Sequence, residues 1–171
     1  MSNLKNKRVI TAALCGSWAT KDMNPAVPYT PEEIARDAYE CWKAGAAIVH
    51  IHVRNADGSP STKFELYKET IERIRAFPDC DVCLNITSSG SVDFGDEERI
   101  YPLQKLLPEL ASYDAGTLNW QNRTVFMNPP AFLEKLGYAL QESNIKPEIE
   151  IFDAGMIYNT LYYLKKGVLK A

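Results

Sequence analysis

Short apolar runs alternate along the chain with longer stretches in which apolar residues recur at helical spacing. The runs are rich in β-branched residues, which is typical of strands buried on both faces of a parallel sheet. The pattern predicts strands at residues 9–14, 48–53 and 82–86, a short stretch ending at 113–119, and residues 148–152. It predicts helices at residues 31–44, 64–76, 100–107, 130–141 and 154–166. The order is therefore strand then helix, five times over.

The second strand lies within Ala44–Arg54 and carries the only two histidines of the chain, His50 and His52. Because side chains alternate along a strand, the two imidazoles share one face. Two imidazoles at this spacing can chelate one divalent ion such as zinc, iron or manganese. The alternative is a pair of core histidines held by backbone carbonyls. The residues alone leave both interpretations open.

Five successive strand–helix units predict one α/β domain, residues 1–171, on a parallel sheet. Groups suited to binding follow each strand: Gly16 and Ser17, the two histidines, residues 87–90, Asn119, and Glu150 with Asp153. Convergence at the carboxyl ends of all strands favours a TIM (β/α)8 barrel. A Rossmann sheet would carry a glycine fingerprint after the first strand, and Cys15–Trp18 does not supply one. A complete barrel needs about 200–250 residues, so we expect this chain to cover the first five βα units and to lack three strands.

Composition narrows the range of possible binding partners. The formal net charge is −3 and no block of Lys or Arg occurs, which argues against nucleic acid or an anionic membrane surface. No apolar run approaches the ~18 residues of a membrane span, and the N-terminus lacks an apolar signal core, so we expect a cytoplasmic protein. Cys80 and Cys83 form a C-x-x-C pair, but it enters a strand and no second pair exists. We therefore do not expect a cysteine metal site.

Longer segments carry a family resemblance: Ile10–Ala13, Thr30–Ala35, Ala44–Arg54, Asp57–Ser61, Ala115–Asn119 and Pro147–Met156. In their order and spacing they resemble the β-keto acid cleavage enzymes over nearly the whole chain. The resemblance implies a zinc-dependent TIM barrel. It also implies an acyl transfer between a β-keto acid and acetyl-CoA, which releases acetoacetate and a new acyl-CoA.

The resemblance also implies a ligand set. In the family, two strand-borne histidines and a glutamate from late in the barrel bind zinc, and His50 and His52 match the histidines. The glutamate, together with catalytic arginine and aspartate groups, lies beyond residue 171. Several strands separate Glu150 from the histidines, which argues against Glu150 as a substitute ligand. We therefore expect this chain to bind zinc much more weakly than a complete barrel.

Other residues match substrate-binding positions. The family's Ser-Thr-Gly-Gly turn corresponds to residues 87–90, where Thr87 keeps a hydroxyl and Gly90 keeps the last glycine, and Ser112 matches a further hydroxyl. The alternative is that these residues satisfy their own backbone in a turn. Glu150 matches an acid that faces the pocket in the family. It could equally be a core carboxylate paired with a cation.

Trp18 departs from the family pattern. An amine-binding member has a glutamate there, which pairs with the substrate's ammonium group. A tryptophan cannot form that pair, which suggests an uncharged or differently shaped substrate tail. The alternative is that Trp18 only covers the mouth of the barrel.

Two other hypotheses remain at this point. A metal-dependent hydrolase of the amidohydrolase type also has a His-x-His strand, but that family places it on the first strand and adds later histidines. The second hypothesis is a truncated or split, catalytically incomplete chain. Exposed strand edges then predict a homo-oligomer, a complementing C-terminal half, or marginal folding.

Overall fold

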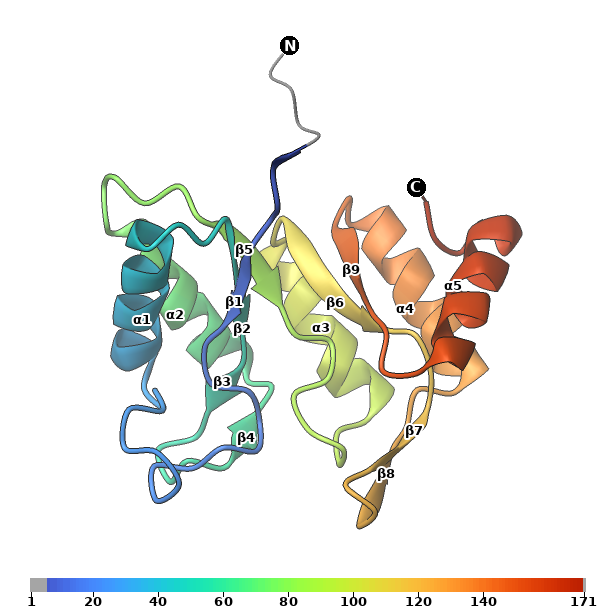
Figure 1. Ribbon diagram of the computed structural model, residues 1–171, viewed down its shortest axis with the longest axis horizontal. Coiled ribbons are helices and arrows are strands. Elements are labelled where there is room, and N and C mark those ends of the chain that lie inside the picture. The colour runs from blue at the N-terminus through green and yellow to red at the C-terminus, as the bar shows by residue number, and fades with distance from the viewer. Residues whose placement is uncertain (1–5, 171) are drawn as a thin grey trace.

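The computed structural model describes residues 6–170 and has a five-stranded parallel sheet at its centre (Figure 1). Its strands are β1 (Thr11–Ala13), β2 (Ile48–Ile51), β5 (Cys83–Ile86), β6 (Leu110–Asp114) and β9 (Lys146–Glu150). They lie in the order β1-β2-β5-β6-β9, and every neighbouring pair is parallel. Consecutive strands of the sheet are therefore neighbours in space, as in the first part of a barrel.

Five helices cover the outer face of this sheet and form an arc around it (Figure 1). They are α1 (Pro31–Lys43), α2 (Phe64–Arg75), α3 (Asp96–Leu106), α4 (Pro130–Glu142) and α5 (Ala154–Lys166). None of the helices in the described part of the chain is long and apolar enough to cross a membrane. The parallel βα arrangement predicted from the sequence is confirmed, with five strands that form part of a TIM barrel.

Local sequence explains where α1 begins. The Thr30 hydroxyl accepts a hydrogen bond from the Glu33 backbone N–H at 3.1 Å, and the Glu33 carboxylate accepts one from the Thr30 N–H at 3.1 Å. This capping box satisfies free N–H groups at the helix start, and Pro31 has no N–H to satisfy. Ile34, Ala35 and Ala38 are then buried against the sheet.

The two faces of the sheet differ in polarity. Residues that point outward are apolar and fully buried under the helices, as Val49, Ile51 and Ile86 show. Residues that point inward include His50, Asn85, Ser112 and Glu148. The apolar core therefore lies between sheet and helices, and the concave inner face is left for polar side chains.

A carboxylate spans this concave face. Glu148 of β9 accepts a hydrogen bond from the Thr11 hydroxyl of β1 at 3.2 Å, and the Asn85 amide of β5 donates to its other oxygen. The side chain of the last strand thus reaches the first strand. Such a contact requires a strongly curved sheet, which is the geometry of a barrel wall.

Several boundaries differ from those predicted. The last strand runs from Lys146 to Glu150, not from 148 to 152, because it pairs residue by residue with β6 up to Asp114. Ile151 and Phe152 lie beyond that ladder, 43% and 45% exposed. The helix α3 begins four residues before the predicted 100, at the acidic segment Asp96–Glu98, which suits a helix N-terminus.

Two hairpins were not predicted. The first pairs β3 (Val53–Arg54) with β4 (Pro60–Ser61), and the second pairs β7 (Leu118–Trp120) with β8 (Thr124–Phe126). Their strands have two or three residues, too few to show an alternating pattern. Both extend from the lower edge of the molecule in Figure 1, where the parallel strands end.

The outer strands and α5 predict self-association. Among residues 6–170, β1 and β9 each have one edge without a paired strand. The side chains of Tyr158, Leu161 and Tyr162 on α5 are 75%, 57% and 56% exposed. We predict that sedimentation velocity of the 171-residue chain at tens of micromolar shows a dimer or larger species.

Changing both Tyr158 and Leu161 to Lys should lower the sedimentation coefficient toward that of a monomer. Changing Glu65 and Glu72 to Lys on the polar face of α2 is the matched control and should leave it unchanged. A chain that sediments as a monomer without any substitution would contradict the prediction.

Candidate active site at the strand ends

The carboxyl ends of the parallel strands surround a cleft of about 340 Å³. It is lined by Cys15, Gly16, Ser17, Trp18, Ala19, His50, His52, Thr87, Ser89, Asp114, Trp120, Phe126, Glu150 and Phe152. These residues come from every strand of the sheet or from the segment that follows it. The cleft is therefore the place where a barrel of this type has its active site.

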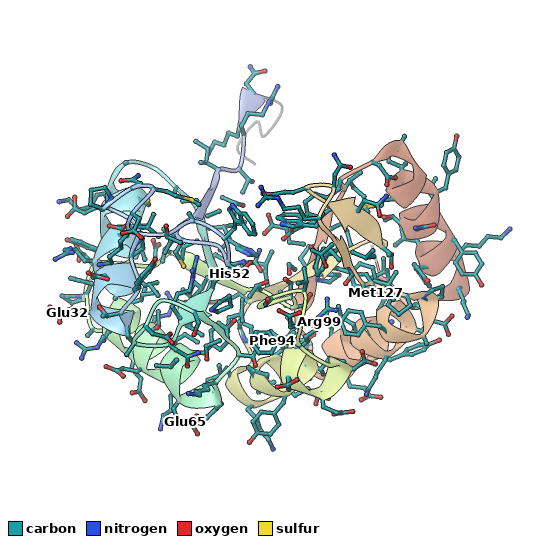
Figure 2. All side chains as sticks on the ribbon, turned by 90° about the horizontal axis from the view of Figure 1, so that it is seen from below. Glu32, His52, Glu65, Phe94, Arg99 and Met127 are labelled. Carbon is teal, nitrogen blue, oxygen red and sulfur yellow. The ribbon has the colours of Figure 1, made fainter. Side chains whose placement is uncertain are left out.

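Both histidines lie in this cleft. His50 is in β2, His52 follows its last residue, and their ring centroids are 5.0 Å apart. Figure 2 shows His52 on the inner side of the arc of helices, with Glu32 and Glu65 on the outer rim. Burial lowers the pKa of His50 to about 4 and that of His52 to about 3. Both imidazoles are thus neutral at pH 7, which is the form that binds metal ions.

The surroundings of the histidines fit a metal ion in part. The Nδ1 atom of His52 is buried and has no hydrogen-bond partner among the described residues. A core histidine held by carbonyls would have one, so an unsatisfied ring nitrogen favours a ligand role. However, no three His, Cys, Asp or Glu side chains within residues 6–170 are arranged to hold an ion. The two histidines are therefore candidate ligands, and the described residues do not arrange a third beside them.

Glu150 lies next to the histidines. Its Oε1 atom is 3.9 Å from His50 Nδ1, although their two strands are not neighbours in the sheet. The curvature of the sheet brings the fifth strand back toward the second. Burial, followed by the charge of Asp114, raises the pKa of Glu150 to about 8. Because His50 is neutral at pH 7, its contact with Glu150 is not an ion pair.

Asp114 is a second acid that sequence reasoning missed. It lies in register with Glu150 on the neighbouring strand, and burial raises its pKa. Its Oδ2 atom has no hydrogen-bond partner among the described residues. The sequence does carry a signal for this acid, since Asp114 is a charged residue at the end of an apolar strand.

The residues predicted to bind an anion do not all line the cleft. Thr87 lines the cleft with the histidines, whereas Ser112 and Gly90 are not part of its lining. The Ser112 hydroxyl accepts a hydrogen bond from the Ser88 N–H at 2.9 Å and so supports the turn from behind. Gly90 has φ of +68°, and a Cβ there would lie 2.5 Å from Thr62 Cγ2, so only glycine fits this turn.

Aromatic side chains line the outer part of the cleft. Trp18 comes from the segment after β1, and Trp120 and Phe126 come from the β7–β8 hairpin. Trp120 packs edge-to-face against Phe126 and Phe152, with centroids 6.2 Å and 6.3 Å away. Sequence reasoning found Trp18 but missed the other three because the hairpin that presents two of them was not predicted.

Arg54 holds the segment that carries Trp18. Its guanidinium is buried and donates to the carbonyls of Gly16 at 2.9 Å, Ala19 at 3.0 Å and Cys15 at 3.3 Å. It also donates to the Gly58 carbonyl at 2.8 Å. One side chain thus fixes the loop after β1 against the turn of the β3–β4 hairpin.

Arg99 fixes loops in the same way on the other side of the cleft. Its guanidinium donates to the Ser88 carbonyl at 2.7 Å, the Met127 carbonyl at 3.0 Å and the Asn128 side chain at 2.6 Å. It also lies over the Phe132 ring, 3.8 Å from its centroid. Figure 2 labels Arg99 and Met127 near the middle of the arc. The turn at residues 87–90 is therefore tied to the end of the β7–β8 hairpin.

Comparison with known proteins identifies the family. The sequence profile of the β-keto acid cleavage enzymes matches residues 7–171. The chain belongs to the β-keto acid cleavage enzyme family. The resemblance inferred from the sequence is thereby confirmed. The two histidines in the cleft at the strand ends agree with membership of this family.

Two curated relatives are named 3-keto-5-aminohexanoate cleavage enzyme. That of Fusobacterium nucleatum is 44% identical over 98% of this chain and 61% of its own length. That of Acetoanaerobium sticklandii is 40% identical over 94% of this chain and 58% of its own length. The chain therefore spans about three fifths of the curated relatives that it matches.

A solved structure supports the fold. The apo structure of ObcA superposes with a TM-score of 0.75, covering 84% of this chain and 34% of that one, at 21% sequence identity. At this identity the likeness bears on the fold alone.

Arg54 provides a test of how the cleft is held. Arg54→Met leaves four buried or partly buried carbonyls without a donor, so we predict a loss of about 3 kcal/mol in the free energy of unfolding, measured by urea denaturation. Arg73→Met is the matched control. Arg73 pairs only with Glu69 on the exposed face of α2, and its loss should cost about 0.5 kcal/mol or less. Equal losses for both variants would contradict the assignment of Arg54.

Proposed function

We propose that this protein acts in the exchange typical of its family, in which a β-keto acid and acetyl-CoA give acetoacetate and a new acyl-CoA. The observation that carries the proposal is the pair of neutral histidines next to the carboxyl groups of Asp114 and Glu150, in a cleft at the strand ends of a member of this family. The names of the relatives, which specify cleavage of a keto acid, support it. No observation favours the amidohydrolase alternative.

The proposed cofactor is zinc, held by His50 and His52. The neutral rings and the unsatisfied Nδ1 atom of His52 fit this role. A bound zinc ion supplies a Lewis acid that polarises a carbonyl oxygen. The remaining ligand positions lie outside what residues 6–170 arrange, so a further donor is proposed from a C-terminal portion or from a neighbouring copy.

The chain's own groups then have distinct roles. The Thr87 hydroxyl lies in the cleft and would donate to the substrate carboxylate, while Ser112 and Gly90 keep the turn that presents it. Glu150, whose pKa is raised, would hold a proton beside the reacting carbonyl. Trp18, from the opposite rim, would contact the substrate tail.

The proposal is tested by assaying the purified protein, supplemented with zinc, for acetoacetate formed from acetyl-CoA and a panel of β-keto acids. We predict that His50→Ala and His52→Ala each lower kcat/KM by about 100-fold or more, because each removes a ligand. Thr87→Ala should raise KM about tenfold through loss of one hydrogen bond to a charged group, and Thr87→Ser should restore it.

Thr160→Ala is the matched control, since its hydroxyl bonds to the Met156 carbonyl on α5, outside the lining of the cleft. It should leave kcat and KM unchanged. Failure of every β-keto acid to yield acetoacetate would exclude the proposed reaction for this chain. Activity that survives loss of both histidines would exclude the proposed site.

A further inference from the structure

A second recess opens off the cleft. It has a volume of about 290 Å³ and is lined by Ser17, Trp18, Pro60, Ser89, Ser91, Val92, Asp93, Trp120, Thr124 and Phe126. Five of these residues, Ser17, Trp18, Ser89, Trp120 and Phe126, also line the cleft with the histidines. The two spaces therefore adjoin each other, so the tail of a ligand held at the histidines would lie next to the recess.

The walls of the recess are aromatic. Trp18, Trp120 and Phe126 provide three large apolar surfaces, and the edge-to-face contact of Trp120 with Phe126 fixes the hairpin side. The segment that carries Trp18 is held by the hydrogen bonds of Arg54. Both sides are thus fixed before a ligand arrives, so the recess has a defined shape.

Charge complementarity is poor for an ionic ligand. No Lys or Arg from residues 6–170 lines the recess or the cleft. A carboxylate placed between the tryptophans would lose its hydration without gaining a partner. The one acidic side chain that lines the recess is Asp93, which is exposed to solvent and so offers only a weak partner to a cation.

We propose that this recess selects β-keto acids with an uncharged, apolar tail, alkyl or aryl, and that Trp18 and Trp120 are the residues that determine this specificity. The assignment rests on the proposed function, because it takes the histidines as the reacting end of the cleft. The acyl-CoA product would then carry the same apolar group. This substrate class differs from the amine named for the two relatives.

The test compares β-keto acids of matched length whose tails end in a methyl, an ammonium, a trimethylammonium or a carboxylate group. The alkyl substrate should have a kcat/KM at least tenfold above each of the charged ones, and each further methylene should raise kcat/KM about fourfold until the recess is full. A preference for trimethylammonium would overturn the proposal, since aromatic walls can also hold quaternary cations. Equal kcat/KM values across the panel would also overturn it and leave the proposed reaction standing.

Two variants test whether Trp120 and Trp18 form the walls that contact the substrate tail. Trp120→Ala should abolish the gain per methylene, and Trp18→Glu should lower kcat/KM for the alkyl substrate while raising it for the ammonium substrate. Tyr138→Ala removes an exposed aromatic side chain of α4 and is the matched control, with no change expected. If Trp18→Glu weakens alkyl and ammonium substrates equally, Trp18 does not set specificity.

A binding measurement separates this proposal from the proposed reaction. Hexanoate, which lacks the keto group, is titrated by calorimetry against adipate and 6-aminohexanoate. Tighter binding of hexanoate, weakened about tenfold in Trp120→Ala, supports the recess even if no β-keto acid is cleaved. No difference between the three ligands contradicts the recess whatever the enzymatic result.

Discussion

The structure depends on a constraint at the concave face of the sheet, where inward-pointing polar side chains must satisfy one another. Glu148 does this over the longest span, since it accepts hydrogen bonds from Thr11 on the first strand and from Asn85 on the third. A partly buried carboxylate without partners would be destabilising. The same curvature that satisfies Glu148 brings Glu150, two residues later, to within 3.9 Å of His50. The site is thus a consequence of how the sheet closes on itself.

Burial then determines the chemistry of that site. It holds both imidazoles neutral and raises the pKa of the Asp114 and Glu150 carboxyl groups. Neutral imidazoles thus lie next to carboxyl groups whose pKa is raised. Two arginines, Arg54 and Arg99, fix the loops around it through carbonyl and amide oxygens and not through carboxylates. Their hydrogen bonds therefore hold the loops that surround the cleft.

Sequence reasoning recovered the repeating architecture because each βα unit carries its own local signals. The capping box at Thr30 and the β-branched run around His50 are such signals, and the family resemblance followed from them. The β7–β8 hairpin was not predicted because its strands are too short to show a periodic pattern, so Trp120 and Phe126 were missed. The proximity of Glu150 to His50 was not predicted for another reason. It depends on the curvature of the whole sheet, which no local sequence pattern encodes. Asp114 was visible as a charge in an apolar strand, but its pairing depends on strand register.

The central claim is that the two histidines form the metal-binding part of a β-keto acid cleavage site. The most direct measurement is an anomalous difference map, recorded at the zinc absorption edge, from crystals of the protein grown with zinc. The account predicts one strong peak about 2.0–2.1 Å from a ring nitrogen of His50 and of His52, with the Glu150 carboxyl group beside it. A map with no peak at these histidines, and with each ring hydrogen-bonded to a backbone carbonyl, would contradict it.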